Sequence, residues 1–248
     1  QIYMQTEPAD PTELIADDIK SMVESFPGDT DSNTTAEKMG KVKYFMTRSL
    51  DPKEIADIVE RIYTVKESYG RNLYSLVIQE GIQSMLTSDG IFTREDKLKD
   101  NAADILLSID NRGYLGKLMP SIYEEWQNEG KFTQNESTGG TEVLQMIMMK
   151  KDYLQSEESK LGLELLQKNI ILDGVSYLFE LPRNEGRMIK GSNAERVILS
   201  VFCSLEGDTL SKWSEEETER ARFLYNKCID NELCERLKGV EKKLGISK

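Results

Sequence analysis

Histidine is absent from the 248-residue sequence, and this absence excludes several kinds of chemistry. Without imidazole there is no Ser-His-Asp or Cys-His nucleophile, no zinc-protease helix motif and no histidine-dependent metal site. A glycine-rich phosphate-binding loop and a dinucleotide-binding fingerprint are missing as well. The sequence therefore predicts no catalytic residues, no cofactor and no metal ligands. We expect a protein that is not an enzyme.

One catalytic alternative survives this exclusion, an enzyme that works through carboxylates alone. Acidic runs such as Asp17-Asp18 and Glu215 to Glu217 supply candidate carboxylates. Adjacent residues on a helix point in different directions, so these runs do not form an acid and base pair. Solvated helix faces explain them better.

Cysteine is scarce, and long apolar runs are missing. The three cysteines, Cys203, Cys228 and Cys234, are an odd number in the last fifth of the chain. This pattern suits a reducing compartment better than a disulfide framework, so we expect a cytoplasmic protein. No apolar run approaches the roughly 18 residues that a membrane span needs. Because the sequence begins with Gln1, we expect it to be part of a longer protein.

Basic residues are outnumbered, with 32 Lys and Arg against 44 Asp and Glu, for a net charge of −12. Nucleic acids and anionic membranes bind clustered Lys and Arg, so the charge argues against both as partners. A partner protein that presents a basic or amphipathic segment fits better. The alternative is that the exposed carboxylates only keep the protein soluble.

Apolar residues recur at spacings of three and four, and no long stretch alternates with period two, so we expect an all-α fold. Helix start signals stand at 10–13, at 51–52 and at 214–217. We expect a loop at 29–35 and a Met-rich helix at 143–153. Other helices are expected at 97–109, 115–127, 161–171 and 194–205. The expected organisation is a helical lead-in at 1–50, a first repeat pair at 51–128, a loop or seam at 129–140, and a second repeat pair with a C-terminal helix at 141–248.

One nine-residue stretch occurs twice, at 101–109 and at 193–201, with four identical positions and three aliphatic exchanges. Each copy follows a related segment that contains a glycine, at a period of about 92 residues, and an internal duplication of this kind is a strong fold signal. We expect Leu106 and Leu199 in the core. We expect the two glycines at equivalent turns, as helix caps with positive φ or as points of close helix approach. The candidate repeat positions are Gly81, Asn101, Ala102, Leu106, Gly174, Asn193, Ala194 and Leu199.

The segment 80–86 followed by 101–107 resembles an armadillo-type repeat, and 173–175 with 193–199 resembles a second. The resemblance covers roughly 66–126 and 158–237, and the period equals two repeat units of about 40 to 47 residues. Resemblance to armadillo and HEAT proteins implies a right-handed superhelix of stacked helices with a groove that binds proteins. It implies a scaffold or regulatory domain. The GTPase-binding regulatory region of a formin and an armadillo co-chaperone are the alternatives that it leaves open.

Overall fold

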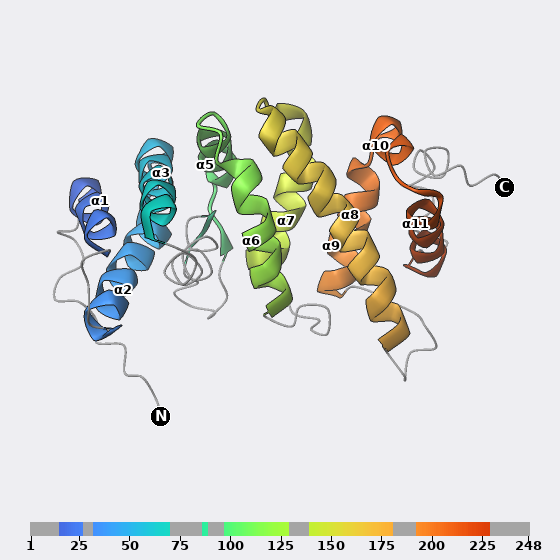
Figure 1. Ribbon diagram of the computed structural model, residues 1–248, viewed down its shortest axis with the longest axis horizontal. Helices are drawn as coiled ribbons and strands as arrows, with labels where there is room; N and C mark the ends of the chain where they lie inside the picture. Colours follow the sequence, from blue (N-terminus) through green and yellow to red (C-terminus); the bar gives the residue numbers. More distant parts are fainter. Residues whose placement is uncertain are drawn as a thin grey trace.

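The structure is a computed structural model, and it describes residues 15–26, 32–69, 86–88, 97–128, 139–180 and 192–228. Over these ranges the chain is mainly α-helical, which confirms the predicted all-α class (Figure 1). The strands β1 (Thr87–Ser88) and β2 (Lys97–Leu98) form one antiparallel pair. Two residues per strand are too few to produce a recognisable period of two, so the sequence pattern did not reveal them.

The helices stack along the long axis of the molecule, from α1 at one end to α11 at the other (Figure 1). Their bounds are α1 Ala16–Ser25, α2 Ser32–Arg48, α3 Pro52–Tyr69, α5 Ala102–Asp110, α6 Leu115–Asn128, α7 Gly139–Met149, α8 Glu157–Glu180, α9 Asn193–Ser204, α10 Gly207–Ser211 and α11 Glu215–Cys228, with a 3-10 turn at Lys151–Tyr153.

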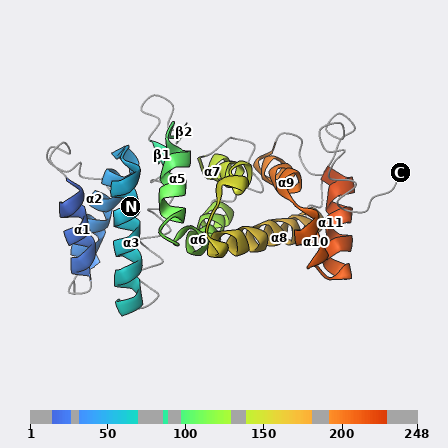
Figure 2. The ribbon, with the colours of Figure 1, turned by 90° about the horizontal axis from the view of Figure 1, so that it is seen from above.

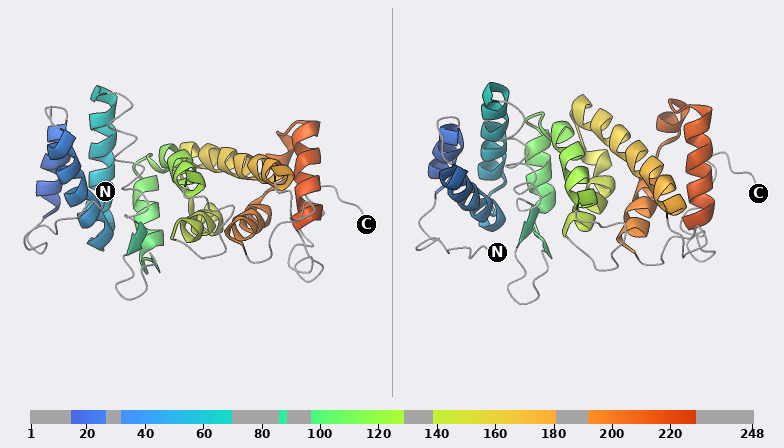
Figure 3. Two further views of the ribbon diagram at one scale, coloured as in Figure 1. Left: turned by 90° about the horizontal axis from the view of Figure 1, so that it is seen from below. Right: turned by 60° about the horizontal axis from the view of Figure 1, so that its bottom comes forward.

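The middle of the stack has two layers of helices (Figure 2). On one side α6 packs against α8, and α8 packs in turn against α11. On the other side α7 packs against α9. Figure 3 shows the same layers from two other directions, with α1 to α3 upright at one end and α11 at the other. Helices that alternate along the chain are thus neighbours within a layer.

Several helix boundaries differ from those expected. The loop expected at 29–35 ends early, because α2 already begins at Ser32. Ser, Asn and Thr favour the first turn of a helix as well as loops, so their polarity was misleading. The helix expected from Lys97 begins only at Ala102, because Lys97 and Leu98 pair with β1.

Two start signals are confirmed. A helix begins at Pro52, and the Asp51 carboxylate accepts a hydrogen bond from the Lys53 backbone N–H at 2.8 Å. Ser214 and Glu217 form a reciprocal capping box, in which each side chain accepts a hydrogen bond from the other residue's backbone N–H. Local capping chemistry therefore places the starts of α3 and α11.

The two copies of the nine-residue stretch form α5 and the first part of α9. Their small residues Ala102 and Ala194 are both buried. Asn101 precedes α5, where its side chain donates to the Leu50 carbonyl instead of capping the helix. Asn193 is the first residue of α9, and Ser192 caps that helix by accepting from the Glu195 N–H at 3.2 Å. The asparagines therefore start the two helices in slightly different ways.

Leu106 is fully buried as expected, but the expectation for Leu199 is wrong. Leu199 is only partly buried and packs against the edge of the core. At the offset of 92 residues, the position that matches Leu106 is Ile198, which is fully buried, and Leu199 matches the half-buried Leu107. Both copies thus bury the same side of the helix, and the matched core pair is Leu106 and Ile198.

Gly174 lies inside α8 and not at a turn, and Gly81 falls outside the described residues. In the part of the chain that the structure describes, the glycine with positive φ is Gly113. Gly174 instead allows side chains of α9 and α11 to approach the backbone of α8 closely. A Cβ atom there would lie 2.8 Å from Ile198 Cδ1 and 3.1 Å from Leu224 Cδ2. The close-approach alternative fits Gly174, and the positive-φ turn does not.

We expect Gly174→Ala to lower the free energy of unfolding by up to about 2 kcal/mol. Overpacking costs roughly 1–3 kcal/mol, and the higher helix propensity of alanine returns about 1 kcal/mol. Gly40→Ala is the matched control, because Gly40 also lies inside a helix but a Cβ atom there would have nothing within 4 Å. Urea unfolding should show a stabilisation of about 0.5–1 kcal/mol at Gly40. Equal stabilisation at both glycines would contradict the packing at Gly174.

Candidate protein-binding surface

Helix α8 is held in place at its N-terminus by a buried carboxylate. Asp110, at the end of α5, accepts a hydrogen bond from the Gln155 N–H at 2.8 Å and another from the Ser156 hydroxyl at 2.9 Å. Ser156 in turn accepts from the Ser159 N–H at 3.0 Å. A negative charge is stabilised at a helix N-terminus by the free N–H groups and the helix dipole. Asp110 therefore fixes the start of α8 against α5.

The crossing of α6 and α8 is a direct backbone contact. A Cβ atom at Gly116 would lie 2.4 Å from the carbonyl oxygen of Glu158, and one at Gly162 would lie 3.0 Å from Gly116 Cα. Two glycines face each other here, so the helices approach more closely than side chains would permit. This crossing determines which side of α8 faces solvent.

Further along the same pair of helices, a polar cluster joins α6 to α8. Asp173 Oδ2 accepts hydrogen bonds from the Tyr123 hydroxyl at 2.7 Å and from Gln127 Nε2 at 3.0 Å. Burial, together with this bond to Asp173, raises the pKa of Tyr123 well above its ordinary value. Tyr123 therefore stays protonated and keeps donating to the Asp173 carboxylate.

The solvent side of α8 carries leucines together with the exposed polar residues Asn169 and Ser176. Leu161 is 62% exposed, Leu165 is 52% exposed and Leu172 is half-buried. At 100° per residue these three leucines lie within an arc of about 40° on the helix. The other sides of α8 pack against α6, α9 and α11. We call Leu161, Leu165 and Leu172 the leucine face.

The two edges of the leucine face differ in charge. On the edge toward α10 and α11, carboxylates are paired with lysines: Lys212 Nζ lies 2.8 Å from Glu164, and Lys168 Nζ lies 2.6 Å from Glu217. On the edge toward α6 lie Glu158 and Asp173, and neither forms an ion pair with a residue that the structure describes. One edge is neutral and the other carries negative charge.

The opposite layer presents a second, more polar surface. On α7 and α9, Gln145 accepts a hydrogen bond from Arg196 at 3.0 Å and donates to Ser200 at 3.3 Å. Met149 is 76% exposed at the end of α7, whereas Met146 and Met148 are buried. The Met-rich segment expected at 143–153 is thus α7 plus a 3-10 turn, and it mostly fills the core.

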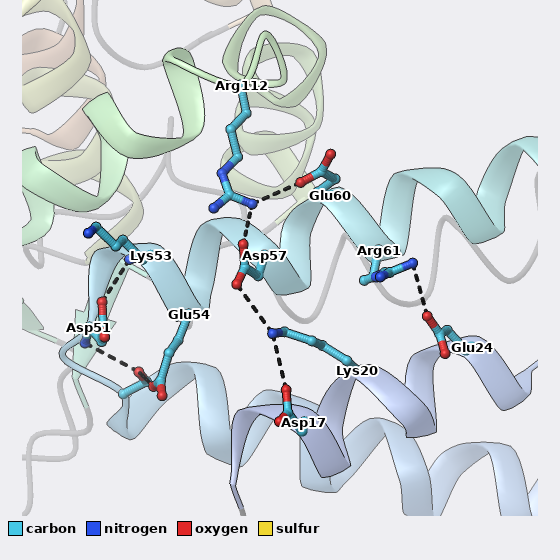
Figure 4. A network of polar contacts seen from close by, with 11 residues as sticks. Asp17, Lys20, Glu24, Asp51, Lys53, Glu54, Asp57, Glu60, Arg61 and Arg112 are labelled. Carbon is cyan, nitrogen blue, oxygen red and sulfur yellow. Dashed lines mark hydrogen bonds and ion pairs between the residues drawn. The ribbon is translucent and has the colours of Figure 1, made fainter.

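A network of charged side chains joins α1, α3 and the turn between α5 and α6 (Figure 4). Arg112 pairs with Asp57 and, at 2.8 Å, with Glu60, while Lys20 lies 3.2 Å from Asp57 and 3.3 Å from Asp17. Burial opposes ionisation of Asp57, but hydrogen bonds from Arg112 and Lys20 outweigh it and hold the pKa of Asp57 below its ordinary value. Asp57 is therefore held in its ionised form, and the network ties α1, α3 and the turn after α5 together.

Lys99 is the one basic side chain buried among the described residues, at 4% exposure. Its ammonium group donates to the carbonyl oxygens of Met46 at 2.6 Å and Ser49 at 2.8 Å, at the C-terminal end of α2. Cations are favoured at helix C-termini. Lys99 therefore ties the segment before α5 to the junction of α2 and α3, and burial lowers the pKa of Lys99 to about 8.

This lowered pKa predicts a stability that rises with pH. Between pH 8 and 10.5 the unfolded chain holds a proton on Lys99 that the native state has released, so the native state gains stability with increasing pH. From about pH 7 to pH 9.5 the gain should be about 2 kcal/mol relative to Lys99→Met. Urea unfolding of wild type and Lys99→Met at both pH values measures the difference in their free energies of unfolding. The contributions of all other titrating groups are the same in both proteins and cancel. A constant difference would show that Lys99 titrates normally.

A small hollow of about 250 Å³ lies where α2 meets α3, lined by Tyr44, Phe45 and Arg48 among others. It is smaller than the roughly 300–1,000 Å³ of typical ligand pockets. Arg48 already stacks on the Tyr44 ring, with 4.3 Å between its guanidinium carbon and the ring centre. The leucine face is therefore the stronger candidate for a binding site.

Within the described ranges, no group of three or more acidic or cysteine side chains is placed to hold a metal ion. None of the helices described here is long and apolar enough to cross a membrane. Comparisons of the chain with protein-family models, with curated proteins and with solved structures find no match.

Proposed function

We propose that this chain is a non-catalytic protein-interaction scaffold, or a regulatory domain of a larger protein, that binds a partner protein through the leucine face of α8. The observation that carries the proposal is the exposure of Leu161 and Leu165 on a helix whose other sides are already buried. Contiguous exposed apolar side chains on a soluble domain mark interaction sites. The absence of histidine supports a role without catalysis.

We further propose that the stack is an armadillo or HEAT-type superhelix with an internal duplication of about 92 residues. Two observations support this. Alternate helices pack within layers, with α6 against α8 and α7 against α9. The two copies of the nine-residue stretch bury the same positions, including Leu106 and Ile198. A formin-type regulatory region and an armadillo co-chaperone are both specific forms of this scaffold role, and a cytoplasmic location suits both.

The expected contribution of the leucine face follows from its exposure. Full burial of a leucine side chain is worth about 1.5–3 kcal/mol, and roughly half of that remains available at Leu161 and at Leu165. Together they should contribute about 2–3 kcal/mol to binding. At 1.4 kcal/mol per factor of ten, loss of both should weaken binding by about 30-fold or more.

The direct test is capture of a stoichiometric partner by the wild-type chain and by the double variant Leu161→Ser/Leu165→Ser. The matched control is Ile15→Ser/Leu50→Ser, which removes two aliphatic side chains of similar exposure at the other end of the molecule. Urea unfolding should show that both variants stay folded and lose similar amounts of stability, because the replaced side chains are similarly exposed. We expect the control to retain the partner and the α8 variant to lose it. Equal retention would refute the proposed binding surface.

A further inference from the structure

We infer that the segment bound at the leucine face is an amphipathic α-helix with basic residues at both ends of its apolar stripe. The inference rests on the proposed function and adds the chemistry of the partner. It is drawn from the shape of the leucine face and from the unequal charge of its two edges.

The shape of the leucine face favours a helix over an extended segment. Leu161 and Leu172 are eleven residues apart, so the face is about 16 Å long along the axis of α8. An extended peptide binds best by adding a strand to a sheet edge. The backbone of α8 is hydrogen-bonded within the helix and offers no such edge. A helix satisfies its own backbone groups and can pack its apolar side chains beside the leucines.

The charge of the α6 edge specifies basic residues. Glu158 is exposed near one end of the leucine face, and Asp173 is half-buried near the other. Asp173 accepts its hydrogen bonds from Tyr123 and Gln127, which are neutral donors, so they do not cancel its charge. On the opposite edge, Lys212 and Lys168 already neutralise the neighbouring carboxylates. A partner therefore gains charge complementarity on the α6 edge only.

The spacing of the two carboxylates sets the spacing of the basic residues. Glu158 and Asp173 are fifteen residues apart on one helix, a separation of about 22 Å. A helix lying alongside α8 has the same rise per residue, so its two basic side chains should lie about four turns apart. Apolar side chains between them would contact the leucines.

Two synthetic helical peptides of about 20 residues test the inference. They share one apolar stripe, and their ends carry either two lysines or two glutamates at the spacing given above. Fluorescence anisotropy with the full chain measures binding of each. We expect the basic peptide to bind about tenfold more tightly, which is the combined effect of two exposed ion pairs. Glu158→Gln/Asp173→Asn should remove this preference, and raising the salt concentration should reduce it.

The control Asp208→Asn/Glu215→Gln removes two exposed carboxylates of α10 and α11 and should leave the preference intact. Equal binding of the two peptides, or a preference that survives in Glu158→Gln/Asp173→Asn, overturns the inference. A dimer of the free chain that Leu161→Ser/Leu165→Ser dissolves also overturns it, because a second copy then occupies the face. If partner capture still depends on Leu161 and Leu165, the inference fails while the proposed function stands.

Discussion

Replacing Gly116 by alanine should destabilise the chain by at least about 3 kcal/mol, the upper part of the range for overpacking. The new Cβ atom would meet the backbone of α8, at 2.4 Å from the Glu158 oxygen and 2.6 Å from its carbonyl carbon. Backbone atoms cannot move aside as the end of a side chain can, so α6 and α8 would have to separate. Urea unfolding followed by circular dichroism measures the loss.

Gly162→Ala should act in the same direction with a smaller effect, because its Cβ would lie 3.0 Å from Gly116 Cα and from the Gly116 oxygen. The control is again Gly40→Ala, a helical glycine with open space around it. If Gly116→Ala cost less than about 1 kcal/mol, the two helices would not cross at these glycines. The orientation of the leucine face would then be wrong as well, since this crossing sets it.

The second large effect is expected at the matched core pair. Leu106→Ala and Ile198→Ala should each lower the free energy of unfolding by about 2–5 kcal/mol, because both side chains are fully buried. Leu199→Ala, one residue further along α9, should cost only about 1 kcal/mol, because its side chain is partly exposed. Urea unfolding of the three variants separates the two positions of α9.

An exposed leucine supplies the control for this series. Leu165→Ala removes the same atoms as Leu106→Ala but should lower the free energy of unfolding by only about 1 kcal/mol, because Leu165 is already 52% exposed. If Leu199→Ala lowered the free energy of unfolding more than Ile198→Ala, the buried side of α9 would be displaced by one residue from the one described. The burial pattern that the two copies share would then disappear.

Helix positions with local signals could be predicted from the sequence, and those that depend on distant contacts could not. The start of α3 follows from Asp51 and Pro52, and the start of α11 follows from Ser214 and Glu217. The delayed start of α5 depends on the pairing of Lys97 with β1, which involves a segment nine residues earlier. The sequence pattern predicts a turn at Gly174, but Ile198 and Leu224 pack against this glycine inside a helix.

The candidate binding surface was harder to predict than the fold class. The sequence predicts one apolar helix at 161–171, and an apolar helix without a polar side gives no signal for which leucines are exposed. Leu161 and Leu165 are distinguished from Leu163 and Leu166 only by where α6 and α11 pack. The predicted repeat positions among the described residues lie at α5 and α9, apart from Gly174, which lies on a buried side of α8.

The most direct test of the central claim, that the leucine face binds a partner protein, is site-specific photo-crosslinking. Asn169 is exposed on α8 beside the leucine face, and Lys43 is exposed on α2 at the far end of the stack. A photoreactive residue placed at Asn169 in the full-length protein in cells should yield one defined crosslinked partner, and the same residue at Lys43 should not. Crosslinks of equal yield at both positions, or a defined partner at Lys43 alone, would contradict the account.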